Sequence, residues 1–169
     1  MSELADLEGR LRRLEDEREI GQLLAAYGSS LDYGDVEGFV RCFTADGVLE
    51  LSRPRSAKVA IRAVGERELR AFAESHSRSP ERWHKHIVAG SIITVDQDRG
   101  CVSSYYVLLE EDRGRPVVRS FGRYLDRLVR DRSAGWRLSR RKAEVEAAVP
   151  DMAPLLAPRS AGEIDIGDD

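Results

Sequence analysis

The order of two hydrophobic periodicities constrains this chain most. Apolar residues recur at spacings of three and four from Leu4 to Leu31, which is typical of an amphipathic helix. From Trp83 onward the pattern predicts long strands over 84–95, 101–110, 117–130 and 136–144. Short turn-forming separators between these strands favour hairpins. Helices followed by a meander predict an α+β fold in which N-terminal helices wrap one face of a curved antiparallel or mixed sheet.

Shorter elements are predicted between these two regions. Asp35 can cap a second helix over 36–42, which a turn at 44–47 ends. A strand follows at 48–51 and a loop at 53–57. A third helix is predicted at 65–76, with Leu69 and Phe72 facing inward.

The chain divides into an arm, one domain and a tail. Residues 1–14 form a highly charged helical segment, which is either solvated or packed against a partner subunit. Residues 15–148 are long enough for a single hydrophobic core. Residues 149–169 are rich in proline at first and acidic at the end, so we expect an extended or disordered tail.

Composition argues against several classes of protein. A net charge of -3 and a pI near 5.7 do not favour binding to nucleic acid. We find no apolar run that could span a membrane and no secretory segment, which predicts a cytoplasmic protein. Cys42 and Cys101 lack any metal-ligand or disulfide pattern, and we expect both to fill the core.

Asp32 directly follows the buried stripe of the first helix. Aspartate at such a place is either a turn residue that ends the helix or a buried acid. Both interpretations stay open from the residues alone.

His84 and His86 lie two residues apart in a predicted strand, so their side chains share one face of the sheet. Histidine can act as base or acid at neutral pH, and a carboxylate partner would fix its tautomer. Alternatives are ordinary core or surface histidines, or a metal pair. A metal would need a third ligand, which the nearby sequence does not offer, so we expect no metal site.

Polar residues of the later strands could contact a substrate. Tyr105 and Tyr106 are adjacent and must face opposite ways, so one phenol looks inward. Arg123 is either an inward cation that binds an anionic oxygen or half of a surface ion pair. The basic cluster at 137–142 is interpreted as the solvated face of the last strand.

The motifs together are similar to those of the SnoaL-like family, within the nuclear-transport-factor-like superfamily that includes scytalone dehydratase and ketosteroid isomerase. The matching segments are 20–27, 31–35, 39–48, 86–90, 122–126 and 135–138. The resemblance implies a cone with an internal apolar pocket. It specifies the reaction much less, because this fold hosts many chemistries.

In the dehydratase and dehydrochlorinase relatives, an aspartate at the end of the first helix orients a strand histidine that removes a proton. The resemblance implies these catalytic roles for Asp32 and His86. Three positions depart from scytalone dehydratase: Leu31 stands where it has a tyrosine, Tyr105 near its further histidine, and Arg123 near its substrate-binding asparagine. These differences argue against the same substrate.

The resulting hypothesis is a cofactor-free lyase or isomerase, dehydratase-like, acting on a small, mostly apolar cyclic carbonyl or hydroxy compound of secondary metabolism. The expected substrate-binding residues are Tyr27, His84, Tyr105 and Arg123. Alternatives are a polyketide aldol cyclase and a non-catalytic ligand-binding or assembly subunit, comparable to ring-hydroxylating dioxygenase β subunits. We expect a homodimer or homotrimer that associates through the outer sheet face.

Overall fold

The structure is a computed structural model that describes residues 3–52, 58–76 and 78–149. Its helices are α1 (Glu3–Tyr33), α2 (Val36–Arg41) and α3 (Gly65–Ser75). Its strands are β1 (Phe43–Ser52), β2 (Val59–Val64), β3 (His84–Asp96), β4 (Arg99–Asp112), β5 (Arg115–Asp131) and β6 (Gly135–Ala148). Among these described residues there is no helix both long enough and apolar enough to cross a bilayer.

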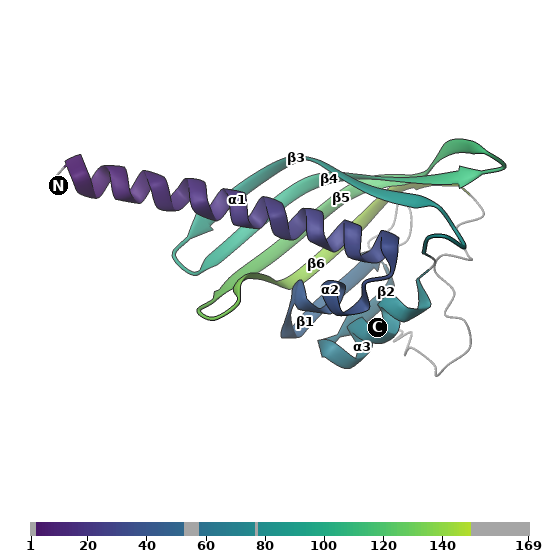
Figure 1. The fold of residues 1–169 in the computed structure, drawn as a ribbon, viewed down its shortest axis with the longest axis horizontal. Coiled ribbons are helices and arrows are strands. Elements are labelled where there is room, and N and C mark those ends of the chain that lie inside the picture. Colours follow the sequence, from purple (N-terminus) through teal and green to yellow (C-terminus); the bar gives the residue numbers. More distant parts are fainter. Residues whose placement is uncertain (1–2, 53–57, 77, 150–169) are drawn as a thin grey trace.

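The strands form one open sheet in the order β2-β1-β6-β5-β4-β3. Strands β3 to β6 make the predicted antiparallel meander, and β1 joins β6 in parallel. Figure 1 shows α1 lying across one face of this sheet, with α2 and α3 near the β1–β2 end. The predicted α+β fold with a mixed sheet and helices on one face is therefore confirmed.

The hydrophobic core lies between the helices and the inner face of the sheet. Ile20 and Leu24 of α1 are buried, and so are Leu69 and Phe72 of α3, as the helical spacing predicts. Burying a leucine, isoleucine or phenylalanine side chain stabilises the fold by about 1.5–3 kcal/mol. The helices are therefore held mainly by this apolar contact.

Helix α1 has an exposed half and a packed half. Leu4, Leu7, Leu11 and Leu14 are 55–65% exposed, and Figure 1 shows the N-terminal end of α1 extending beyond the sheet. The first buried residue of the helix is Asp16, which accepts a hydrogen bond from the indole Nε1 of Trp136 at 3.1 Å and pairs with an arginine of β5. The helix is thus attached to the sheet from Asp16 onward.

The region around the first strand differs from the prediction. The turn expected at 44–47 lies inside β1, which begins at Phe43. Phe43 pairs with Leu138 and Val48 with Arg140, so the four intervening residues bulge from the ladder. The turn-forming residues therefore interrupt a strand, because pairing with β6 resumes beyond them.

Two further expectations were incomplete or wrong. Strand β2 was not predicted, and it pairs with the edge of β1 over residues that are largely half-exposed. Cys42 is buried as expected, but Cys101 is exposed because its position in β4 faces outward. The predicted loop at 53–57 and the tail from 150 lie outside the described residues.

Candidate active site

The end of α1 comes very close to β3. A Cβ atom added at Gly28 would lie 3.2 Å from the His86 carbonyl oxygen, tighter than an ordinary contact. Glycine at this position therefore allows the helix to approach the strand. Asp32 lies one helical turn further along the same face, and it is only 3% exposed.

Asp32 contacts His86 at two points. The Oδ1 atom of Asp32 lies 2.6 Å from Nδ1 of the His86 ring, and the His86 backbone N–H donates to both carboxylate oxygens at 3.2 and 3.3 Å. Burial raises the pKa of Asp32, but the hydrogen bonds and charge of His86 outweigh this effect and hold the pKa below its ordinary value. The predicted meeting of these side chains is present, and their catalytic roles stay a prediction.

Because Nδ1 faces the carboxylate, Nε2 is the ring nitrogen of His86 that a substrate could reach. A carboxylate in this position selects the tautomer with the proton on Nδ1 and stabilises the ring when Nε2 takes a second proton. The arrangement is chemically suited to a general base.

His84 lies behind this pair rather than in the pocket. Its Nε2 atom is 3.4 Å from Asp32 Oδ1, and its side chain is 1% exposed. Burial, followed by the charge of His86, lowers the pKa of His84 to about 4. The sequence offered no third metal ligand nearby, but the fold supplies one, since Asp32, His84 and His86 bring three ligand atoms within 4.8 Å of one another.

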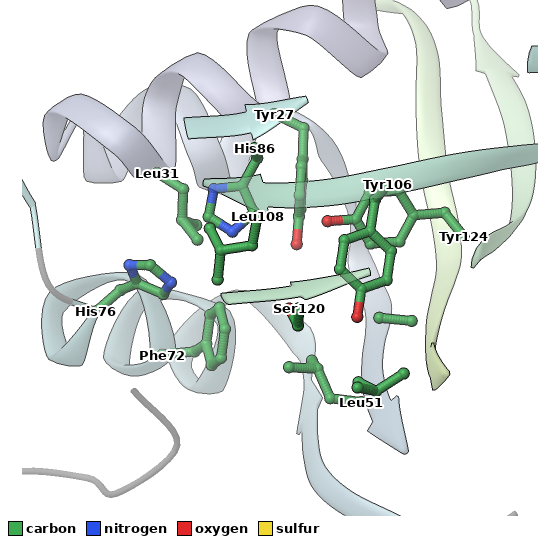
Figure 2. A pocket seen from close by; sticks show the side chains of 12 residues that line it. Tyr27, Leu31, Leu51, Phe72, His76, His86, Tyr106, Leu108, Ser120 and Tyr124 are labelled. Carbon is green, nitrogen blue, oxygen red and sulfur yellow. The ribbon is translucent and has the colours of Figure 1, made fainter. Parts of the chain in front are cut away.

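His86 lines a small apolar pocket between the helices and the sheet (Figure 2). The cavity volume is about 50 Å³. Its lining residues are Tyr27, Leu31, Leu51, Phe72, His76, His86, Tyr106, Leu108, Ser120, Tyr124, Ala143 and Val145. The pocket wall is therefore mainly apolar, with a few hydroxyl and imidazole groups among the apolar side chains.

Tyrosine hydroxyls supply most of the other polar groups. Figure 2 shows the Tyr27 hydroxyl pointing into the pocket, and its role in binding a substrate stays a prediction. Burial raises the pKa of Tyr27 and of Tyr106 to about 12, and that of Tyr124 well above its ordinary value. These phenols therefore stay protonated at neutral pH and can donate hydrogen bonds to a substrate oxygen.

Tyr105 and Arg123 do not reach the pocket, which corrects their predicted role. They are cross-strand neighbours on the outer face of the sheet, where the Tyr105 side chain is 63% exposed. Arg123 pairs there with Glu144 at 2.8 Å and Glu146 at 3.2 Å. Strand alternation places Tyr106, not Tyr105, on the inner face.

Arg141 is also placed differently from the prediction, because it is fully buried. Its guanidinium donates two hydrogen bonds to Asp126, at 2.8 and 2.7 Å, and stacks over Tyr27 and Tyr124 at 4.0 and 4.3 Å. The cause is a bulge: consecutive residues of β5 pair with Leu138 and Arg140. The extra residue between them moves Arg141 to the inner face.

Sequence reasoning missed His76, which lines the pocket directly after the end of α3. Its ring centroid lies 5.1 Å from that of His84 and 5.5 Å from that of His86. The chain has three histidines, and the fold gathers all of them. Because histidine is so rare in this chain, each one could have been considered as a site residue. The direction of His76 could not be predicted, however, because it lies at a helix end, where periodicity does not show which way a side chain faces.

An open sheet wrapped by helices around a small apolar pocket defines a cone-shaped α+β protein. The particular family follows from the sequence, because the model of the SnoaL-like domain matches residues 12–142. The chain therefore belongs to the SnoaL-like family. No curated protein matches it.

Solved structures share the fold. Rv3472 of Mycobacterium tuberculosis, a protein of unknown function, is 25% identical with a TM-score of 0.65, over 84% of this chain and 79% of that one. An NTF2-like protein with a cystatin-like fold from Novosphingobium aromaticivorans is 24% identical with a TM-score of 0.73, over 92% and 98%. The β subunit of a putative aromatic-ring-hydroxylating dioxygenase from the same organism is 19% identical with a TM-score of 0.72, over 88% and 98%.

Proposed function

We propose that this protein is a lyase or isomerase that removes a proton from a small, mostly apolar carbonyl or hydroxy compound without a cofactor. His86 is the base. Asp32 is the positioning residue that orients the imidazole and stabilises its protonated form. Elimination of water is the variant that we favour.

One observation carries this proposal: the 2.6 Å contact between Asp32 Oδ1 and Nδ1 of an imidazole that lines the pocket. The backbone N–H of His86 also donates to Asp32, so the carboxylate is held relative to the strand as well as to the ring. A preorganised pair of this kind contributes about 10²- to 10⁴-fold to a rate through proton transfer.

The proposed step balances without an external reagent. A C–H bond next to a carbonyl breaks, and its proton moves to Nε2 of His86. The electron pair of that bond forms a carbon–carbon double bond while the C–O bond of a hydroxyl breaks. The proton from His86 passes to the departing hydroxyl, so that water leaves, and protonated Tyr27 or Tyr106 stabilises the carbonyl oxygen by a hydrogen bond.

The size of the cavity restricts the substrate. Its volume is about 50 Å³, whereas an engineered cavity that binds benzene has about 150 Å³. A cyclic substrate therefore requires side chains of the lining, such as Phe72 or Leu108, to move when it binds. Aldol cyclisation of a polyketide would use the same base and needs still more room.

The test is turnover by His86→Gln in a screen of hydroxy-carbonyl compounds for loss of water. We expect kcat to fall by about 10²- to 10⁴-fold, with the circular dichroism spectrum unchanged. Tyr105→Phe is the control, since Tyr105 lies on the outer face and its replacement leaves kcat within a few-fold of wild type. A folded His86→Gln variant with nearly full turnover removes the base from the mechanism.

A second candidate function is a non-catalytic assembly subunit, and the small cavity favours it. The outer sheet face also carries apolar side chains that are 44–72% exposed: Ile87, Ile92, Tyr105, Val118 and Phe121. Covering such residues stabilises an oligomer, and we propose a homodimer or homotrimer in either case.

Light scattering that gives a monomer at micromolar concentration contradicts the oligomer, and Phe121→Glu should shift a dimer or trimer toward monomer.

A further inference from the structure

A second imidazole approaches the same carboxylate oxygen that contacts His86. His84 and His86 extend from one face of β3, while Asp32 comes from the end of α1. The Nε2 atom of His84 is 3.4 Å from Asp32 Oδ1, and Nδ1 of His86 is 2.6 Å from it. The three ligand atoms lie within 4.8 Å of one another.

His84 needs a partner that the described protein atoms do not supply. Both of its ring nitrogens are buried and make no hydrogen bond, and the 3.4 Å approach to Asp32 does not have hydrogen-bond geometry. A buried donor or acceptor left unpaired destabilises the fold, because it has lost its hydrogen bonds to water and gained none. A ligand that bound one of these nitrogens would remove this destabilisation.

The donor set fits a transition-metal cation. Two imidazoles and one carboxylate are a ligand set of open zinc sites, with bonds of about 2.0–2.2 Å. Ligand atoms around a tetrahedral zinc ion then lie roughly 3.3 Å apart, close to the 3.4 Å between Asp32 Oδ1 and His84 Nε2. The 2.6 Å contact between Asp32 and His86 is shorter because it is a hydrogen bond and no metal separates the two atoms.

We propose that Asp32, His84 and His86 form a Zn²⁺ site in which the metal replaces the proton between Asp32 and His86. Entry of the metal widens the 2.6 Å contact and satisfies one nitrogen of His84. It also occupies the carboxylate that orients His86. Insofar as the proposed function holds, Zn²⁺ therefore inhibits proton removal, so the same three residues hold either a proton or a metal.

The test needs no substrate. Protein freed of metal by dialysis against a chelator is titrated with Co²⁺, followed by visible absorption, and with Zn²⁺, followed by calorimetry. We expect one ion per chain. His84→Gln should weaken binding by at least about 10-fold, because replacing a residue that only hydrogen-bonds to a metal ligand already weakens binding by about 10- to 100-fold. His76→Gln is the matched control, because His76 neighbours both histidines but is outside the ligand set.

The control variant should bind Zn²⁺ as tightly as wild type. Equal loss in His76→Gln and His84→Gln overturns the ligand assignment, and saturation only at millimolar Zn²⁺ overturns the site. Neither result depends on turnover. If the protein binds no Zn²⁺, the proposal that His86 is the base still stands, and if His86 is not the base, the binding measurement is still valid.

A second variant guards against misfolding of His84→Gln. His84→Phe keeps an aromatic ring and removes both unpaired nitrogens, so the metal-free variant should be at least as stable as metal-free wild type. Added Zn²⁺ should raise the thermal midpoint of wild type and not that of His84→Phe, since a ligand stabilises only the protein that binds it. Equal shifts in both proteins contradict the proposal.

Discussion

Of the buried aspartates among the described residues, Asp32 and Asp126 both lie on the inner side of the fold, but they have different partners. Asp126 is 3% exposed and directs both carboxylate oxygens to the fully buried Arg141. Asp32 is equally buried, yet its partners are imidazoles, of which His86 lines the pocket and His84 leaves both nitrogens unpaired. One carboxylate is saturated by a permanent cation, while the other meets groups that can gain or lose a proton.

This difference suggests a structural role for Asp126 and a chemical role for Asp32. In this bidentate pair both carboxylate oxygens accept hydrogen bonds from the guanidinium, and the pair cannot transfer a proton because arginine stays protonated at any ordinary pH. Arg141 also stacks over Tyr27 and Tyr124, so it fixes the orientation of two pocket phenols. We therefore expect Asp126 and Arg141 to hold the pocket in shape, whereas Asp32 and His86 are the residues for which we propose a chemical role.

The largest predicted effect comes from breaking the saturated pair. Asp126→Asn leaves the Arg141 charge buried without compensation, so the free energy of unfolding should fall by about 3–5 kcal/mol. Urea denaturation measures it. The double variant Asp126→Leu with Arg141→Met should recover much of the loss, because it removes both charges. A loss below about 1 kcal/mol in the single variant contradicts a structural role for the pair.

The matched change in the other carboxylate should cost much less stability. In Asp32→Asn the new amide oxygen can still accept a hydrogen bond from Nδ1 of His86, so we expect a loss of about 1 kcal/mol. Turnover should nevertheless fall by at least about 10²-fold, because the protonated imidazole loses its counter-charge. The two isosteric variants thus separate stability from activity, and the same stability loss in both would remove the distinction between the carboxylates.

The sequence predicted the helices and hairpins well because their signals are local. Spacings of three and four placed Leu69 and Phe72 in the core, and Asp35 caps α2 through a 2.8 Å hydrogen bond from the Gly38 backbone N–H. The meander begins at His84 as predicted, and the other bounds of its strands differ from the prediction by one to four residues. The contact between Asp32 and His86 was expected from the family resemblance, since no spacing rule links residues this far apart.

Errors came where one residue changes which face a strand presents. Adjacent Tyr105 and Tyr106 must face opposite ways, but alternation alone does not say which one is inside. Arg141 lies beyond a bulge in β6, and a bulge exchanges the two faces for every later residue. The register between β5 and β6 decides this, and register depends on tertiary pairing that a single sequence does not contain.

The smallest predicted effect is a change in the free energy of unfolding at alkaline pH. It tests whether the charge of Arg141 influences the ionisation of Tyr27. Burial raises the pKa of Tyr27 to about 12; the nearby Arg141 charge opposes this rise, and the Asp126 charge adds to it. An unfolded tyrosine ionises near pH 10. Between about pH 10 and about pH 12 the folded protein therefore holds a proton that the unfolded chain has lost, and the free energy of unfolding falls as pH rises.

Tyr27→Phe removes this contribution, so the decline between pH 10 and pH 11 should become shallower, by at most about 1.4 kcal/mol per pH unit. Urea denaturation at a series of pH values measures the slope. In folded Asp126→Asn the arginine charge is no longer offset, so Tyr27 should ionise at lower pH, which phenolate absorbance detects. Equal slopes for wild type and Tyr27→Phe would mean that Tyr27 is solvated, and a solvated Tyr27 would not belong to a buried apolar pocket that Asp126 and Arg141 hold in shape.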